Sequence, residues 1–482
     1  MKLTNVSRLV MRPIGHSGKA KKGHLVFDAS FESGNLGRVD RISHLTYDLF
    51  VRPDIADPRH RLWFNFTIDN AINNQRIIIN IVNLAKSCHI FHSGFGPVVR
   101  SSQYPQWCAI QPEYVFYYRS PEHRMRYVLS FAFVFNGKDN DVYQFALSYP
   151  YTYSKHCHQL QHWKHIYYNK PNVGLTQNFR FEINTIGKSL QNRDIHLITI
   201  GGNKCLEDSK IGSKIVIITA RLHPSETATS YICEGIINLL ISDDPVATCL
   251  RSYTKFYIIP MPNPDGVFVG NTRTSVIGSD LNASWHKISP LMHPELVAVK
   301  QTIEDIAKTY GEDVDTYIDL HAHTYLLGAC IYGVSRDDIF HMERHALFPK
   351  LLSIIADDFY IDNTVYCKER HSSGSSRSYM TTIFHSKTNC YTLEVSHYGY
   401  YDKQTLGHTI IPYTDKKYKL LAENMVIALL DCYRTIGHIP PNDISPQIQH
   451  LLSHTSQGML SQSNEYKLKD SIIKLTTKSI NS

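Results

Sequence analysis

The hydrophobic pattern of the chain changes near residue 150, and this change constrains the fold more than any other feature. From about residue 25 to 150, short alternating runs such as RLWFNFTI and YVLSFAFVF are rich in aromatic and β-branched residues and are separated by turn signals such as Asn136-Gly137. About seven runs of this kind predict a β-sandwich. Beyond residue 150, near-continuous apolar runs such as KIVIITA, KFYIIPM and TYIDLHAH alternate with helical patterns. That alternation predicts an α/β domain whose sheet is buried on both faces.

This pattern divides the chain into four parts. We expect a disordered basic tail over 1–24, a β-sandwich over 25–152, an α/β domain with a mixed sheet flanked by helices over 153–437, and a mostly disordered polar tail over 438–482. The first 24 residues contain no acidic residue. A solvated tail is the simpler interpretation of this segment, and a mitochondrial presequence is the alternative.

Composition narrows the class of protein. Hydrophobic residues make up 43% and charged residues 19%, which is typical of a soluble globular protein, and no apolar run approaches the roughly 20 residues that span a bilayer. The net charge of +7 permits an acidic partner without the concentrated basic patches of a nucleic-acid-binding protein. The ten cysteines include no Cys-x-x-Cys pair and are expected to be reduced. We therefore expect a cytoplasmic protein that binds neither nucleic acid nor membrane.

A histidine and a glutamate stand where a metal site can form. In KIVIITARLHPSETATS, His223 and Glu226 follow a buried strand at the start of a helix. A hydrolytic zinc site needs three nitrogen or oxygen ligands and a fourth position for water. Among 26 histidines, about one His-x-x-Glu arises by chance, so the pair alone is equally explained as a loop histidine beside a helix-start glutamate.

A second strand end supplies the third candidate ligand. TYIDLHAH places His321 at the end of another buried strand, and strand ends of an α/β sheet open onto one edge. His323 is the rival ligand because it points to the same face. Asp319, two residues before His321, is a candidate partner for a ligating imidazole.

Two further residues complete the predicted chemistry. Glu394 interrupts the apolar strand CYTLEVS, and a carboxylate there is costly to bury unless it faces a cleft or an ion. A glutamate beside zinc-bound water can act as the general base. Arg273, in a long loop after NPDG, is a cation that could polarise a scissile carbonyl.

The order of these motifs resembles the M14 metallocarboxypeptidases, and the stretches FDASFESGNL, LHPSETATS, IDLHAHT and CYTLEVSHYGY resemble the cytosolic carboxypeptidases, the tubulin deglutamylases. The resemblance runs from Phe27 to about Arg434. It implies a zinc-carboxypeptidase-like catalytic domain over 153–437 behind a β-sandwich, and one Zn²⁺ per chain. It also implies the roles of the candidate residues: His223, Glu226 and His321 as zinc ligands, Glu394 as general base and Arg273 as oxyanion support.

The resemblance also implies a preference for glutamate. Arg377 matches a basic position expected to line the specificity pocket, where a guanidinium could hold a glutamate side chain in bidentate fashion; an exposed loop arginine is the alternative. The family usually reads Asp-Leu-Asn-Arg, whose asparagine and arginine grip the terminal carboxylate. This chain has Asn282 but Ala283 in place of the arginine. Loss of such a bond typically costs about 1.5–3 kcal/mol.

These observations predict a zinc metallocarboxypeptidase that removes glutamate from polyglutamylated tubulin or other acidic protein tails. The partner class implies association with the cytoskeleton, a centriole or a cilium. Because of Ala283, the alternative is a zinc-retaining protein of weakened activity that binds microtubules or acidic tails. A zinc amide deacylase is a third hypothesis, since deacylases also occur on this fold.

Overall fold

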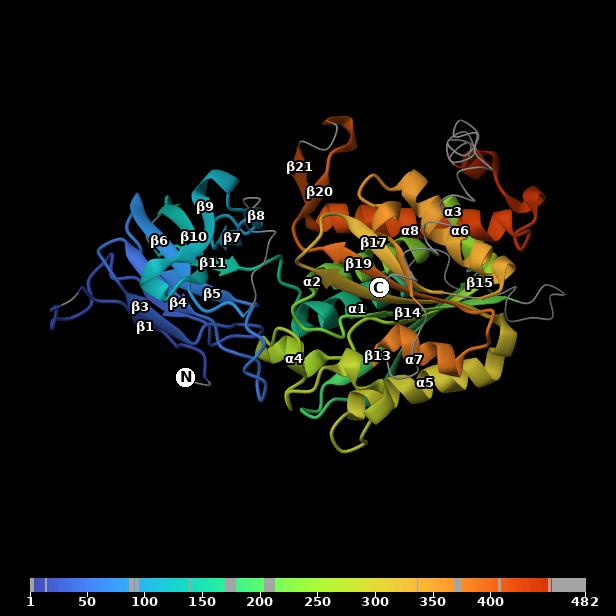
Figure 1. Ribbon diagram of the computed structural model, residues 1–482, viewed down its shortest axis with the longest axis horizontal. Helices are drawn as coiled ribbons and strands as arrows, with labels where there is room; N and C mark the ends of the chain where they lie inside the picture. Colours follow the sequence, from blue (N-terminus) through green and yellow to red (C-terminus); the bar gives the residue numbers. More distant parts are fainter. Residues whose placement is uncertain are drawn as a thin grey trace.

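The computed structural model describes residues 4–13, 15–85, 91, 95–137, 140–169, 179–202, 213–335, 337–367, 374–405, 409–449 and 452. A β-sandwich lies beside a larger α/β domain (Figure 1). The predicted fold class, an α/β domain with a mixed sheet preceded by an all-β sandwich, is confirmed. The exact domain limits stay predictions, and of the predicted tail 438–482, residues 450, 451 and 453–482 lie outside the described residues.

Two sheets form the sandwich, in the orders β1-β2-β5-β11-β7-β8 and β3-β4-β6-β10-β9. Their inward-facing aromatic and branched side chains, among them Phe66, Phe131 and Phe145, make one buried core. Strand β1 pairs with β2 although it lies within the segment predicted to be a tail. The strands are β1 (Leu9–Val10), β2 (Val26–Asp28), β3 (Arg38–Arg41), β4 (Thr46–Phe50), β5 (Asn65–Asp69), β6 (Gln75–Ile81), β7 (Val98–Ser101), β8 (Cys108–Ala109), β9 (Val115–Ser120), β10 (Arg126–Phe135) and β11 (Tyr143–Ala146).

The α/β domain is built on a sheet in the order β12-β13-β15-β14-β16-β19-β17-β18. Strands β15, β14, β16 and β19 run parallel at its centre, and β17 is antiparallel to β19. Helices cover both faces, which is why the central strands read as continuous apolar runs. The strands are β12 (Phe179–Lys188), β13 (Asp194–Gly202), β14 (Lys214–Ala220), β15 (Thr254–Ile259), β16 (Val314–His323), β17 (Ala329–Val334), β18 (Val365–Cys367) and β19 (Asn389–Ser396), with β20 (Gly399–Tyr401) and β21 (Ile410–Pro412) as a separate pair.

The helices fall into two layers (Figure 1). Helix α2 packs between the sheet and α8, and a Cβ on Gly235 would come 2.7 Å from the Cβ of Ala422, so glycine permits this close approach. On the other face, α5 and α7 cover a separate core. None of the described helices is long and apolar enough to cross a membrane. The helices are α1 (Tyr153–Tyr168), α2 (Thr227–Leu240), α3 (Pro245–Tyr253), α4 (Pro264–Val269), α5 (Pro294–Tyr310), α6 (Ile339–Ile355), α7 (Ser376–Ile383) and α8 (Asp415–Thr435).

One aspartate of the sandwich fixes a loop of the α/β domain. The carboxylate of Asp54, which is 1% exposed, accepts hydrogen bonds from the backbone N–H groups of Thr272, Arg273 and Thr274 and from the Thr274 hydroxyl. Buried backbone donors must be paired, and a carboxylate is a strong acceptor for several of them. The loop that carries Arg273 is therefore positioned by the neighbouring domain.

Candidate metal centre

The turn between β14 and α2 presents His223 and Glu226. Arg221, at the start of this turn, has a positive φ of 62° and is fully buried. Its Nε donates to the Pro224 carbonyl oxygen at 2.8 Å and its Nη1 donates to the Ser230 hydroxyl at 2.8 Å. These bonds tie the turn back onto α2 and direct the two side chains beyond the end of the sheet.

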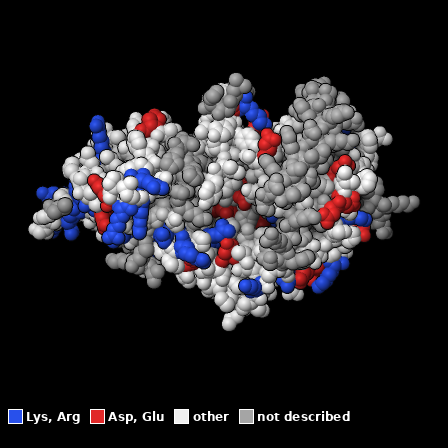
Figure 2. All heavy atoms as spheres, viewed as in Figure 1, with Lys and Arg blue, Asp and Glu red and all other residues white. Residues whose placement is uncertain are grey.

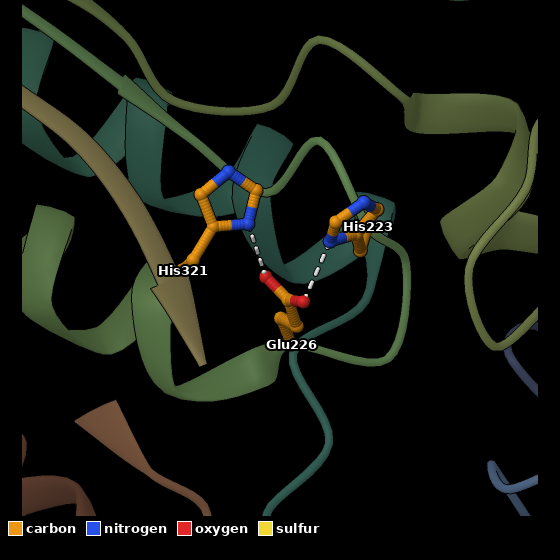
Figure 3. A group of neighbouring side chains, drawn as sticks. All are labelled: His223, Glu226 and His321. Atoms are coloured by element: carbon orange, nitrogen blue, oxygen red, sulfur yellow. Dashed lines mark hydrogen bonds and ion pairs between the residues drawn. The ribbon is translucent and has the colours of Figure 1, made fainter. Parts of the chain in front are cut away.

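The structure brings His223, Glu226 and His321 together at the carboxyl ends of β14 and β16 (Figure 3). The Glu226 carboxylate lies between the two imidazoles, with Oε1 2.6 Å from His223 Nδ1 and Oε2 2.9 Å from His321 Nδ1. One candidate ligand atom from each of the three residues lies within 4.8 Å of the other two. The Ala322 N–H also donates to Glu226 Oε2 at 3.1 Å.

Each imidazole is oriented from behind by a carboxylate. Asp319 Oδ2 lies 2.9 Å from His321 Nε2, and Asp280 Oδ1 lies 3.1 Å from His223 Nε2. Thr219 in turn donates its hydroxyl to Asp319 Oδ1 at 2.7 Å. A carboxylate on Nε2 selects the imidazole tautomer that leaves Nδ1 free to bind a cation.

The electrostatics favour a cation at the centre. Burial alone would raise the pKa of Glu226, but the two neighbouring imidazoles outweigh burial and hold that pKa well below its usual range. For His321, burial opposes the positive charge, yet Asp319 and Glu226 raise its pKa well above the usual value. Two imidazole nitrogens and a carboxylate, buried and surrounded by further carboxylates, match the donor set of a hydrolytic zinc site.

The rival ligand His323 lies outside this group. It lines the same cleft, but burial lowers its pKa to about 4, and its Nε2 has no hydrogen-bond partner among the described residues. The three-residue group contains His321 instead. The roles of all these residues as ligands stay predictions.

Glu394 stands on the strand next to His321. It lies in β19 at the register position of His321 in β16 and of Cys330 in β17, and its side chain lines the cleft that holds the candidate ligands. Burial raises the pKa of Glu394 to about 7, although His321 opposes this rise. A carboxylate with this pKa can both accept and release a proton near neutral pH.

Arg273 is fixed at the same cleft. Its Nε donates to Asp280 Oδ2 at 2.6 Å, so Asp280 joins this guanidinium to His223. Hydrogen bonds to His223 and the charge of Arg273 outweigh burial and keep the pKa of Asp280 far below its usual range. The sequence identifies Asp280 only as the first residue of the Asp-Leu-Asn motif. It does not predict the contact between Asp280 and His223.

Asn282 and Arg377 differ in their relation to the cleft. Asn282 lines it, and its Oδ1 accepts a hydrogen bond from the Ser376 N–H at 2.8 Å. Arg377 is half-buried, and its Nη1 donates to the Gly333 carbonyl oxygen at 2.8 Å. Arg377 is not among the described residues that line the cleft. Tyr332 does line the cleft, and the charge of Arg377 opposes the rise that burial causes in the pKa of Tyr332. The role of Arg377 in specificity stays a prediction.

The sandwich forms part of the wall of the cleft. The cleft has a volume of about 380 Å³, and Arg59, His60 and Arg61, from the loop before β5, form part of its wall. Burial lowers the pKa of His60, and the charges of Arg273 and Asp280 have smaller and opposite effects on it. No local sequence signal connects residues more than two hundred positions apart.

Comparison with known proteins decides the family. A sequence profile described as zinc carboxypeptidase matches residues 175–419, and one described as cytosolic carboxypeptidase N-terminal domain matches residues 27–142. The human protein cytosolic carboxypeptidase 6 is 43% identical over 430 residues, which cover 89% of this chain and 83% of the human one. The chain belongs to the cytosolic carboxypeptidase family. The resemblance that the motifs indicate is thereby confirmed.

Other relatives agree with this assignment. The cytosolic carboxypeptidase 6 of Caenorhabditis elegans is 38% identical over 420 residues, which cover 86% of this chain and 88% of the worm protein. The crystal structure of a metallo-carboxypeptidase from Burkholderia cenocepacia shares the fold, with a TM-score of 0.69 at 21% identity, and the match covers 86% of this chain and 100% of that one. As a metallocarboxypeptidase of this family, the protein is expected to hold zinc, and the donor set described above fits that ion.

Proposed function

We propose that the protein removes glutamate from polyglutamylated or acidic C-terminal protein tails such as those of tubulin. One observation carries this proposal: the cleft that contains the candidate metal group is lined by Arg59, Arg61 and Arg273, and its only carboxylates among the described lining residues are Glu226 and Glu394. Arg59 pairs with Asp57 and Arg273 pairs with Asp280, but Arg61 makes no ion pair among the described residues. A cation therefore remains on the wall when one carboxylate faces a metal and the other serves as base. Such a wall attracts an acidic chain.

The residues of the site divide the reaction among them. Bound zinc would polarise the scissile carbonyl and acidify a water molecule. Glu394 accepts the proton of the attacking water and passes it to the departing amine. Arg273, held by Asp280 and by the backbone bonds from Asp54, donates to the oxygen on which negative charge develops. Asn282 contributes to the binding of the terminal carboxylate.

The proposed substrate also implies where the protein acts. Polyglutamylated tubulin occurs on microtubules, so we propose a cytoplasmic protein that associates with the cytoskeleton and with centrioles or cilia. Binding would be electrostatic and would weaken as salt screens the charges.

Release of free glutamate tests the proposal. The purified protein is incubated with a peptide that ends in several glutamates and with polyglutamylated tubulin, with and without a chelator. We expect release that the chelator abolishes, that Glu394→Gln abolishes, and that the matched exposed variant Glu423→Gln on α8 leaves unchanged. Intact peptides, together with cleavage of small N-acyl amino acids, would instead identify a deacylase.

A second candidate function rests on Ala283. This exposed alanine follows Asn282 at the rim of the cleft, where the family usually carries the arginine that grips the terminal carboxylate. A protein without that anchor could bind acidic tails through its arginines and trim them slowly. Binding of polyglutamylated tubulin without release supports this alternative. In that case Ala283→Arg should raise kcat/KM by about one to two orders of magnitude, whereas Ala283→Gln should not.

A further inference from the structure

We propose that an arginine-lined groove on the β-sandwich continues the metal cleft and binds the acidic part of a polypeptide substrate that precedes its carboxyl end. The inference rests on the proposed function and extends it, because it names the surface that takes the substrate chain outside the cleft.

The groove is lined by Arg38 at the start of β3, by Arg61 and by Arg126 at the start of β10, and it has a volume of about 930 Å³. Its other described lining residues are uncharged, so no carboxylate stands among them. Arg61 also lines the metal cleft. Arg61 is therefore common to the walls of both hollows, and the proposed path takes the substrate chain out of the cleft past Arg61 and into the groove.

The cations of the groove are poorly compensated. Arg61 donates its Nε to the Asn83 carbonyl oxygen at 3.0 Å and its Nη1 to the Pro58 carbonyl oxygen, which orients the guanidinium without cancelling its charge. Arg126 makes no ion pair within the part of the chain that the structure describes. Arg38 stacks on the Phe50 ring at 3.7 Å and also lies 3.1 Å from the exposed Asp40.

Figure 2 shows Lys and Arg side chains gathered on the sandwich and toward the region where the two domains meet. A carboxypeptidase holds the last residue of its substrate at the metal, so the preceding residues must pass over the surface at the cleft mouth. Guanidinium groups bind carboxylates in bidentate geometry. Each exposed pair contributes little, but several along one path act together and steer an anionic chain to the site.

Peptides of different length distinguish binding in the groove from binding in the cleft. The wild type, Arg126→Gln and the double variant Arg38→Gln/Arg126→Gln are compared on a peptide of two glutamates and on one of ten. The matched control is Arg76→Gln, an exposed arginine that pairs with Val134 at the opposite end of β10. Thermal unfolding verifies that each variant is folded.

We expect the double variant to raise KM for the long peptide by about threefold to tenfold, with kcat unchanged, and to leave the short peptide and the Arg76→Gln control unaffected. The difference should shrink as salt is added. Equal KM values for the double variant and the Arg76→Gln control on the long peptide would overturn the groove.

Binding decides the question even if no peptide is cleaved. In the Glu394→Gln background, the affinity for a fluorescent ten-glutamate peptide is measured beside a glycine-serine peptide that ends in two glutamates. If Arg38→Gln/Arg126→Gln weakens the affinity for the ten-glutamate peptide alone, the result supports the groove. An equal loss of affinity for both peptides contradicts it. Absence of glutamate release from every peptide by the wild type overturns the proposed function, while this binding comparison still tests the groove.

Discussion

His321 and Glu394 occupy the same register position on the neighbouring parallel strands β16 and β19. Paired positions in a sheet project to the same face, so an imidazole that can bind a metal and a half-buried carboxylate emerge side by side. Their spacing is fixed by backbone hydrogen bonds of the central sheet and does not depend on a flexible loop. This arrangement supplies the pre-organised geometry that general base catalysis needs.

Replacement of Glu394 by glutamine should separate metal binding from catalysis. Glutamine keeps the size of the side chain but cannot accept a proton, so kcat should fall by about two to four orders of magnitude. Zinc content, measured by elemental analysis, should stay at one per chain because Glu394 is not in the three-residue group. Loss of zinc in this variant would mean that Glu394 acts as a ligand.

The carboxylate behind His321 should govern metal affinity. Asp319→Ala removes the partner of His321 Nε2, and we expect zinc affinity to fall by about tenfold to a hundredfold. Competition with a chromophoric chelator measures this change. Asp319→Asn retains a hydrogen-bonding side chain and should cause a smaller loss. Unchanged affinity in both variants would contradict an orienting role for Asp319.

Substitution of Asp54, which lies in the sandwich, should lower both the stability of the protein and the activity of the site in the α/β domain. Asp54→Ala leaves the backbone N–H groups of 272–274 without their acceptor, which should lower the free energy of unfolding by about 2–4 kcal/mol. Because the same loop carries Arg273, kcat should also fall even under conditions where the variant is fully folded. Denaturant unfolding and steady-state kinetics measure the two effects, and Glu113→Ala, an exposed substitution in the same domain, is the matched control. Full activity of folded Asp54→Ala would show that Arg273 needs no support from the sandwich.

Glu295 at the start of α5 should make stability depend on pH. Burial raises the pKa of this glutamate from 4.5 to about 7. The folded state therefore binds this proton more tightly than the unfolded state, so the contribution of Glu295 to stability is greatest below pH 4.5 and falls as pH rises toward 7. Glu295→Gln should remove this dependence, and its Tm relative to that of the wild type should increase between pH 5 and pH 8. A constant difference in Tm would contradict the raised pKa.

The sequence allowed the core of the site to be predicted because its signals are local. His223, Glu226, His321 and Glu394 each follow or interrupt a recognisable buried strand, and parallel strands of one sheet bring their ends together. The central strands were equally accessible, since the apolar runs KIVIITA, KFYIIPM and TYIDLHAH correspond to β14, β15 and β16.

The parts that escaped prediction depend on contacts between distant segments. Asp54 meets the loop 272–274 only once two separate cores have docked, and Arg59 and Arg61 reach the cleft through the same packing. Arg377 donates a hydrogen bond to the Gly333 carbonyl oxygen that no sequence pattern reveals, and its place in the specificity pocket stays a prediction.

The bonds that Asp54 makes have a consequence for any shortened form of this protein. A splice variant or proteolytic fragment that begins at the α/β domain would keep every candidate metal ligand and Asp280, yet the amides of 272–274 would turn to solvent and the loop that carries Arg273 would lose its attachment to the sandwich. Such a fragment would behave as a metal-binding protein with poor turnover. Efficient turnover therefore requires both domains in one chain.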